Sequence, residues 1–113
     1  MENAILVKSF ALSVRIVKLY KYLTENKKEF IMSKQLLRCG TSVGANVTEA
    51  QRAQSKPDFK SKMSIALKEA YEVDYWIKLL YHTNYLNQKE FHSIFKDNDE
   101  IICLLVAICK SSS

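Results

Sequence analysis

Glycine and proline are scarce in this sequence, with two Gly and one Pro among 113 residues. β-Sandwiches and barrels need a turn about every 8 to 12 residues, and such turns favour Gly, Pro, Asn and Asp. We therefore expect a few long helices. The hydrophobic fraction of 48% and the charged fraction of 26% are those of an ordinary globular protein. We expect one domain, 1–113, because the length leaves no room for a second.

Long apolar runs are also absent. The longest is IICLLVAIC at 101–109, whereas a helix that crosses a bilayer needs about twenty apolar residues. Charged residues interrupt the first twenty positions, which argues against a signal peptide. We expect no membrane span and a cytoplasmic location.

Patterns typical of catalysis or metal binding are missing as well. The three cysteines, Cys39, Cys103 and Cys109, have no metal-ligand or redox spacing, so we expect reduced thiols in the core. Neither His82 nor His92 has a glutamate three positions before it, as a di-iron bundle requires. No phosphate-binding loop follows the glycines. We expect no enzyme activity, no metal and no cofactor.

Hydrophobic periodicity and capping residues predict four amphipathic helices, at about 3–24, 33–53, 56–84 and 88–110. The expected N-caps of the last three are Ser33, Ser55 and Asn87, and Ser55 and Asn87 are each followed three positions later by an acidic residue, as in a capping box. Short connections make neighbouring helices antiparallel. The predicted fold class is all-α, an antiparallel up-down-up-down four-helix bundle.

Apolar spacing predicts which face of each helix is buried. The expected core face of the first helix consists of Leu6, Phe10, Val14, Val17 and Tyr20. That of the second helix consists of Leu36, Gly40, Val43, Val47 and Ala50. Gly40 and Gly44 each cost a helix about 1 kcal/mol relative to Ala. We expect close helix contact to compensate for that cost.

The fourth helix is apolar nearly all round between positions 101 and 109. A helix in a bundle needs one buried face, so the surplus apolar face indicates a subunit interface. We expect a homo-oligomer whose interface includes aliphatic residues of this run: Ile101, Ile102, Leu104, Leu105, Val106 and Ile108. Burial inside a single bundle is the alternative.

Charge is unevenly distributed along the chain. Residues 1–68 contain 13 Lys+Arg against 5 Asp+Glu, and residues 69–113 contain 4 against 7, so the segments carry +8 and −3. A basic surface attracts polyanions, and we expect RNA or DNA binding through phosphate contacts. The candidate residues are Lys8, Arg15, Lys18, Lys34, Arg38, Arg52, Lys56 and Lys60. The alternative is a protein-interaction or scaffolding module with an acidic protein partner and no nucleic acid.

Several polar residues of the middle helices lie beside the apolar faces: Asn46, Glu49, Glu69, Glu72 and Asp74. We expect a structural polar network that includes Asn46, Glu49 and Glu72, with Arg38 or Lys68 as counter-charge. The region of the third helix contains five aromatic residues: Tyr71, Tyr75, Trp76, Tyr81 and Tyr85. We expect them mainly in the core and in interfaces, and the alternative is that they form a base-stacking surface.

The segment 33–80 resembles the bacterial four-helix bundle protein family, which includes proteins encoded by intervening sequences within 23S ribosomal RNA genes. Family members look like QLRRA, then SIPANIAEG, R-x-S, EF, IALGS and ELE. The matching positions are Gln35, Leu36, Arg38, Ser42, Ala45, Asn46, Glu49, Arg52, Ser55, Phe59, Ala66, Leu67, Glu72 and Asp74. Gly44 stands where the family often has Pro, and Ala50 where it often has Gly.

This resemblance implies a non-enzymatic, all-helical protein. Some relatives, the accessory variability determinants of diversity-generating retroelements, form barrel-like homopentamers whose basic surface engages nucleic acid and a reverse transcriptase. The resemblance therefore implies a pentamer, with a dimer as the fallback, and a reverse transcriptase as a candidate partner.

Overall fold

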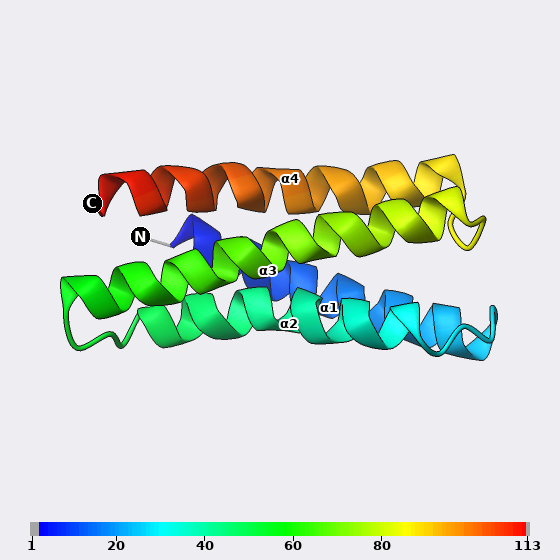
Figure 1. Cartoon of the computed structure of the whole chain (residues 1–113), viewed down its shortest axis with the longest axis horizontal. Coiled ribbons are helices and arrows are strands. Elements are labelled where there is room, and N and C mark those ends of the chain that lie inside the picture. Colours follow the sequence, from blue (N-terminus) through cyan, green and yellow to red (C-terminus); the bar gives the residue numbers. More distant parts are fainter. Residues whose placement is uncertain (1–2, 113) are drawn as a thin grey trace.

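The computed structural model describes residues 3–112 and shows four helices there: α1 (Ala4–Glu25), α2 (Met32–Ala50), α3 (Lys56–His82) and α4 (Gln88–Ser111). Consecutive helices run antiparallel, and the α1–α2 and α3–α4 connections lie at the same end of the molecule (Figure 1). Each helix packs against the next, and α4 also contacts α1. The predicted all-α four-helix bundle is confirmed, and no strand occurs among the described residues.

Two of the predicted N-caps are confirmed. The Ser55 side chain accepts a hydrogen bond from the backbone N–H of Asp58 at the start of α3. Asn87 and Glu90 form a reciprocal capping box at the start of α4, in which each side chain accepts a hydrogen bond from the other residue's backbone N–H. These local signals fix where the two helices begin.

The predicted cap of α2 at Ser33 is wrong. The carboxylate of Glu29 accepts hydrogen bonds from the backbone N–H groups of Ile31 and Met32, at 3.1 Å each, and of Ser33, at 2.7 Å. Ser33 is buried, and its hydroxyl donates to the Glu29 carbonyl oxygen. Glu29 therefore satisfies the free N–H groups that Ser33 was expected to serve.

α2 also ends earlier than predicted, at Ala50. The next three backbone N–H groups, those of 51–53, each donate to a carbonyl three residues back, which forms a tighter turn than the α-helix.

The core face of α2 lies where it was predicted, because Leu36, Gly40, Val43, Val47 and Ala50 are all buried. Its two glycines face α1. A Cβ atom on Gly40 would lie 2.8 Å from Cγ1 and Cγ2 of Ile16, and one on Gly44 would lie 3.1 Å from the backbone oxygen of Ser9. The expected close helix contact is therefore the α1–α2 contact.

The predicted core face of α1 is wrong for Phe10, Val14 and Val17, which are exposed, whereas Leu6 packs partly against the core and Tyr20 is half-buried. The buried residues of this helix are Ile5, Ser9, Leu12, Ile16 and Leu23. Four residues of the helix instead form an exposed outer stripe, which we define as Val7, Phe10, Val14 and Val17. α1 carries apolar residues on two faces, and the face that contains Ser9 is the one that packs because small residues allow α1 to approach Gly44 closely.

The expected interface on α4 is wrong for two of its residues, Ile101 and Leu105, while Leu104, Val106 and Ile108 are only partly buried and their role as an interface stays a prediction. Ile101 and Leu105 are fully buried in the chain's own core, and Ile102, Leu104 and Ile108 are partly buried against it. α4 packs against both α3 and α1, so more than one of its faces is covered. Within the described residues, none of the helices combines the length and apolar character that crossing a bilayer requires.

Candidate nucleic-acid interface

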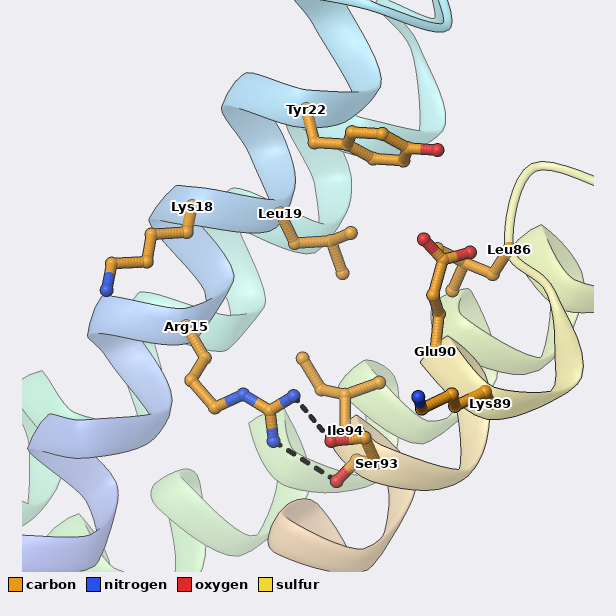
Figure 2. Close-up of a pocket in the computed structure, with 9 residues that line it drawn as sticks. All are labelled: Arg15, Lys18, Leu19, Tyr22, Leu86, Lys89, Glu90, Ser93 and Ile94. Atoms are coloured by element: carbon orange, nitrogen blue, oxygen red, sulfur yellow. Dashed lines mark hydrogen bonds between the residues drawn. The ribbon is translucent and has the colours of Figure 1, made fainter.

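A groove of about 520 Å³ separates the second half of α1 from the start of α4. Nine residues line it: Arg15, Lys18, Leu19, Tyr22, Leu86, Lys89, Glu90, Ser93 and Ile94. Leu19 and Ile94 point into the groove, while the Tyr22 ring extends from α1 towards α4 (Figure 2). The groove therefore has an apolar floor with polar and charged side chains around it.

Arg15 holds one end of the groove in place. Its guanidinium donates to the carbonyl oxygen of Ser93 at 3.1 Å and to the Ser93 hydroxyl at 2.9 Å (Figure 2). It also pairs with the carboxylate of Asp97 at 2.5 Å. Arg15 thus joins α1 to α4, and much of its charge is balanced within the chain.

Six exposed lysines lie in the second half of α1, in the α1–α2 connection and in the first turns of α2 and α4, towards the end of the bundle where the α1–α2 and α3–α4 connections lie (Figure 1). We call this set the basic end: Lys18, Lys21, Lys27, Lys28, Lys34 and Lys89. None of the six forms an ion pair with another described residue. Lys27 lies over the Tyr22 ring, with its Nζ atom 5.9 Å from the ring centroid. The Lys18 side chain points away from the groove, towards solvent (Figure 2).

Three carboxylates lie near these lysines, those of Glu25, Glu29 and Glu90, and none forms an ion pair with them. Glu25 is exposed at the end of α1, and the other two cap helices. Glu29 binds the N-terminus of α2 through three backbone N–H groups. Glu90 accepts a hydrogen bond from the backbone N–H of Asn87 at 2.8 Å at the N-terminus of α4. The positive end of each helix dipole offsets part of the carboxylate charge. We infer a positive potential at the basic end.

The eight basic residues named from the sequence do not gather on one surface. Lys18 and Lys34 belong to the basic end. Arg52 and Lys56 lie at the opposite end, at the α2–α3 connection, and Lys60 follows one turn later in α3. The other three pair with acidic residues on neighbouring helices: Lys8 with Glu100, Arg15 with Asp97, and Arg38 with Glu69 and Glu72.

Sequence reasoning missed four members of the basic end, Lys21, Lys27, Lys28 and Lys89, and the groove residue Tyr22. The signal that could have found two of them is the pair of adjacent lysines in the turn ENKKEFI at 25–31. A turn residue is exposed, so its charge is less often paired than that of a residue between two packed helices.

The predicted polar network divides into separate contacts. Glu72 accepts hydrogen bonds from Arg38 and from the Trp76 indole, and these partners hold the pKa of its carboxyl below the usual value although burial opposes them. Glu49 instead pairs with Lys62 at 3.1 Å. The Asn46 amide donates to the carbonyl of Ser42 in its own helix. Arg38 is therefore the counter-charge of Glu72, as expected, but Asn46 and Glu49 are not part of this contact.

The three cysteines form no disulfide with one another, and they differ in environment. Cys39 is buried, and desolvation raises the pKa of its thiol to about 12. Cys109 is half-buried, and Cys103 is exposed, so the expectation of a core thiol is wrong for Cys103. No group of three His, Cys, Asp or Glu side chains within 3–112 is arranged to hold a metal ion.

The aromatic residues of the α3 region divide between core and surface. Trp76, Tyr81 and Tyr85 pack against the core, as expected for most of them. Tyr71 and Tyr75 are exposed on α3.

Comparison with known proteins gives a family and a similar fold. Residues 1–107 match the family described as 23S rRNA-intervening sequence protein. A crystal structure of a protein with unknown function from the S23 ribosomal protein family of Bacteroides thetaiotaomicron is 52% identical, with a TM-score of 0.93. The similarity covers 94% of this chain and 98% of that one. No curated protein matches the chain.

Proposed function

This chain belongs to the 23S rRNA-intervening sequence protein family, and from that premise we propose that it is a non-catalytic protein that binds RNA or DNA through its basic end and acts as a homo-oligomer. The basic end carries the proposal, because six exposed lysines without ion pairs lie together there. Nucleic-acid phosphates supply the counter-charges that the chain itself does not provide.

The other surfaces fit a polyanion less well. A second hollow, of about 550 Å³, lies at the α2–α3 connection, and Lys56 is the one cation among its lining residues. Arg38 and Lys8 are bound to acidic side chains, so a phosphate would have to compete with those partners. The lysines of the basic end can contact phosphate without breaking an ion pair.

The outer stripe of α1 supports the homo-oligomer. Phe10 is 69% exposed, and Val7, Val14 and Val17 lie along the same side of the helix. Contiguous apolar residues on an outer helix face are uncommon in monomers and are frequent at protein contacts. A second copy of the chain would bury this stripe.

A titration tests the proposed binding. We expect the protein to bind fluorescein-labelled RNA or DNA at micromolar concentration or below at low salt, measured by fluorescence anisotropy. Affinity should fall steeply as salt rises, with a log-log slope of about −0.9 per phosphate contact on a duplex and about −0.7 on a single strand. Absence of binding at tens of micromolar would contradict the proposal.

Charge reversal tests whether the basic end is the surface that binds nucleic acid. The variant Lys27→Glu/Lys28→Glu should weaken binding by about tenfold or more, because it replaces two free cations with anions. The matched control is Arg52→Glu/Lys56→Glu, which changes the net charge equally at the opposite end of the bundle. Equal losses in the two variants would show that net charge, and not the basic end, determines binding.

An acidic protein partner would use the same lysines and is the alternative. Co-purification from the native cell with and without nuclease treatment distinguishes the two. We expect the co-purifying material to be lost after nuclease treatment, and a partner that remains bound would favour the protein-interaction module.

A further inference from the structure

The turn between α1 and α2 is fixed on both sides. The backbone N–H of Glu29 donates to the carbonyl of Leu23 at 2.9 Å, near the end of α1. The carboxylate and the carbonyl of Glu29 both bind the first turn of α2. Lys28 adopts a left-handed backbone conformation with φ 56°. Such a conformation is uncommon for a residue other than glycine, so it indicates a defined turn.

This fixed turn projects two large apolar side chains into solvent. Phe30 is 58% exposed and Ile31 is 78% exposed. Their backbone positions are set by Glu29, which lies between the lysines and Phe30. The turn thus presents an exposed aromatic ring on an ordered backbone, so little backbone entropy is left to lose when the ring meets a ligand.

The surroundings of Phe30 select the chemistry of that ligand. Lys27 and Lys28 precede the ring in the turn, and Lys34 follows in the first turn of α2, all three exposed and without ion pairs among the described residues. A flat apolar ring among cations complements a flat base joined to phosphates. Proteins that bind single strands combine these two features, aromatic rings for the bases and cations for the backbone.

We propose that Phe30 stacks on an unpaired base, so that the protein prefers single-stranded or bulged nucleic acid to a duplex. This inference rests on the proposed nucleic-acid binding and names the form of the ligand. In a duplex the bases are already stacked and paired, whereas an unpaired base offers its face to an aromatic side chain. Lys27, which lies over the ring of Tyr22, connects the turn with the groove, where Tyr22 and Lys89 extend the same kind of surface.

The test compares a single strand with a duplex of the same length, about 12 nucleotides, within the usual site size of one small binding module. Fluorescence anisotropy gives the affinity of the wild type and of Phe30→Ala for each RNA. We expect Phe30→Ala to weaken single-strand binding about tenfold, since one stacked base contributes about 1–3 kcal/mol. Duplex binding should change less than about threefold, because phosphate contacts remain. Phe30→Trp, which keeps an aromatic face, should retain single-strand binding.

Tyr75→Ala is the matched control, because Tyr75 is 57% exposed and lies on α3, away from the turn. It should leave both affinities unchanged. Thermal unfolding followed by circular dichroism checks that each variant is folded, and Phe30 is exposed enough that its truncation should leave the bundle intact.

The outcomes separate this inference from the proposed function. Equal affinity of the wild type for both RNAs, with no effect of Phe30→Ala, overturns the stacking role and leaves nucleic-acid binding standing. Absence of binding to either RNA and to the corresponding DNA single strand and duplex overturns both. Loss in Phe30→Ala of binding to anionic phosphatidylserine vesicles, with RNA affinity unchanged, would assign the turn to a membrane surface and also overturn the inference.

Discussion

Glu29 performs a structural role that its sequence context conceals. It stands in a charged turn and looks like a solvated residue, while Ser33 has the residue type typical of an N-cap. The structure reverses these roles, because the longer Glu29 side chain reaches three backbone N–H groups from outside the helix. Burial by itself raises the pKa of Glu29, but the hydrogen bonds from Ser33, Met32 and Ile31 outweigh it, so the pKa lies below the usual 4.5.

The lowered pKa of Glu29 predicts a pH dependence of stability. A carboxyl whose pKa is lower in the folded state stabilises the fold when it is ionised, above pH 4.5, and this contribution disappears as pH falls through the folded pKa. Glu29→Gln should therefore reduce the free energy of unfolding by about 1 kcal/mol at neutral pH, as expected for a lost cap. Urea unfolding followed by circular dichroism should show this deficit shrinking in acid.

Glu25→Gln provides the control, because Glu25 is exposed at the end of α1 and forms no ion pair with another residue that the structure describes. Its effect should be within about 0.5 kcal/mol. A deficit for Glu29→Gln that stays constant from neutral to acid pH would show that the ionised carboxylate is not what stabilises α2.

Asn98 marks another limit of sequence reasoning at this scale. It is part of the polar run DNDE, and its residue type makes it look solvated. Its position, four residues after Ile94 and three before Ile101, nevertheless lies on the apolar face of the helix. In the structure it is fully buried, and its amide donates to the carbonyl of Ala70 at 3.0 Å across α3 and α4, while its side-chain oxygen has no partner among the residues that the structure describes. The spacing could have placed Asn98 inside, but its amide contact with α3 could not be read from it.

At the scale of whole helices, periodicity was sufficient for α2 and insufficient for α1. α2 has one apolar face, so the buried residues follow from the spacing alone. α1 has two apolar faces, and the one that carries Val7, Phe10, Val14 and Val17 is exposed. The choice depends on fit to a partner helix, because Ser9 and the glycines of α2 permit a closer approach than larger side chains would.

This contact predicts the effect of a small substitution in α2. Gly40→Ala gains about 1 kcal/mol of intrinsic helix stability. The added Cβ would lie 2.8 Å from two Ile16 carbons, and overpacking of a core costs about 1–3 kcal/mol. We expect a net loss of about 1 kcal/mol in the free energy of unfolding, measured by urea denaturation.

An Ile16→Ala variant tests whether contact with Ile16 causes the loss of stability in Gly40→Ala. In an Ile16→Ala protein the clash is removed, so Gly40→Ala should become neutral or stabilising, and the two substitutions should be strongly non-additive. Ala45→Gly, at an exposed position of the same helix, measures the propensity term alone and should cost about 1 kcal/mol. An equal cost of Gly40→Ala in both backgrounds would mean that Ile16 is not its cause.

At the scale of the molecule, the net charge of each segment of the sequence does not tell which cations stay unpaired in the fold. The +8 of residues 1–68 includes cations that acidic residues of the other segment balance across helix contacts, as Asp97 does for Arg15 and Glu72 for Arg38. These partners are far apart in sequence, so pairing could not be read from spacing. Of the cations without an ion pair among the described residues, six lie at the basic end, whereas Arg52 and Lys56 lie at the opposite end of the bundle.

We expect self-association through α1 and not through α4, because Ile101 and Leu105 of α4 are buried in the core while the outer stripe of α1 is exposed. Val14→Glu should dissociate the proposed homo-oligomer and leave helicity intact, since the charge is costly only when a partner covers it. Leu104→Glu should instead destabilise each subunit, because Leu104 packs against its own core. Light scattering and circular dichroism distinguish these effects. A wild-type mass near 13.1 kDa at micromolar concentration would contradict the assembly, and an assembled Val14→Glu protein would exclude the outer stripe as its interface.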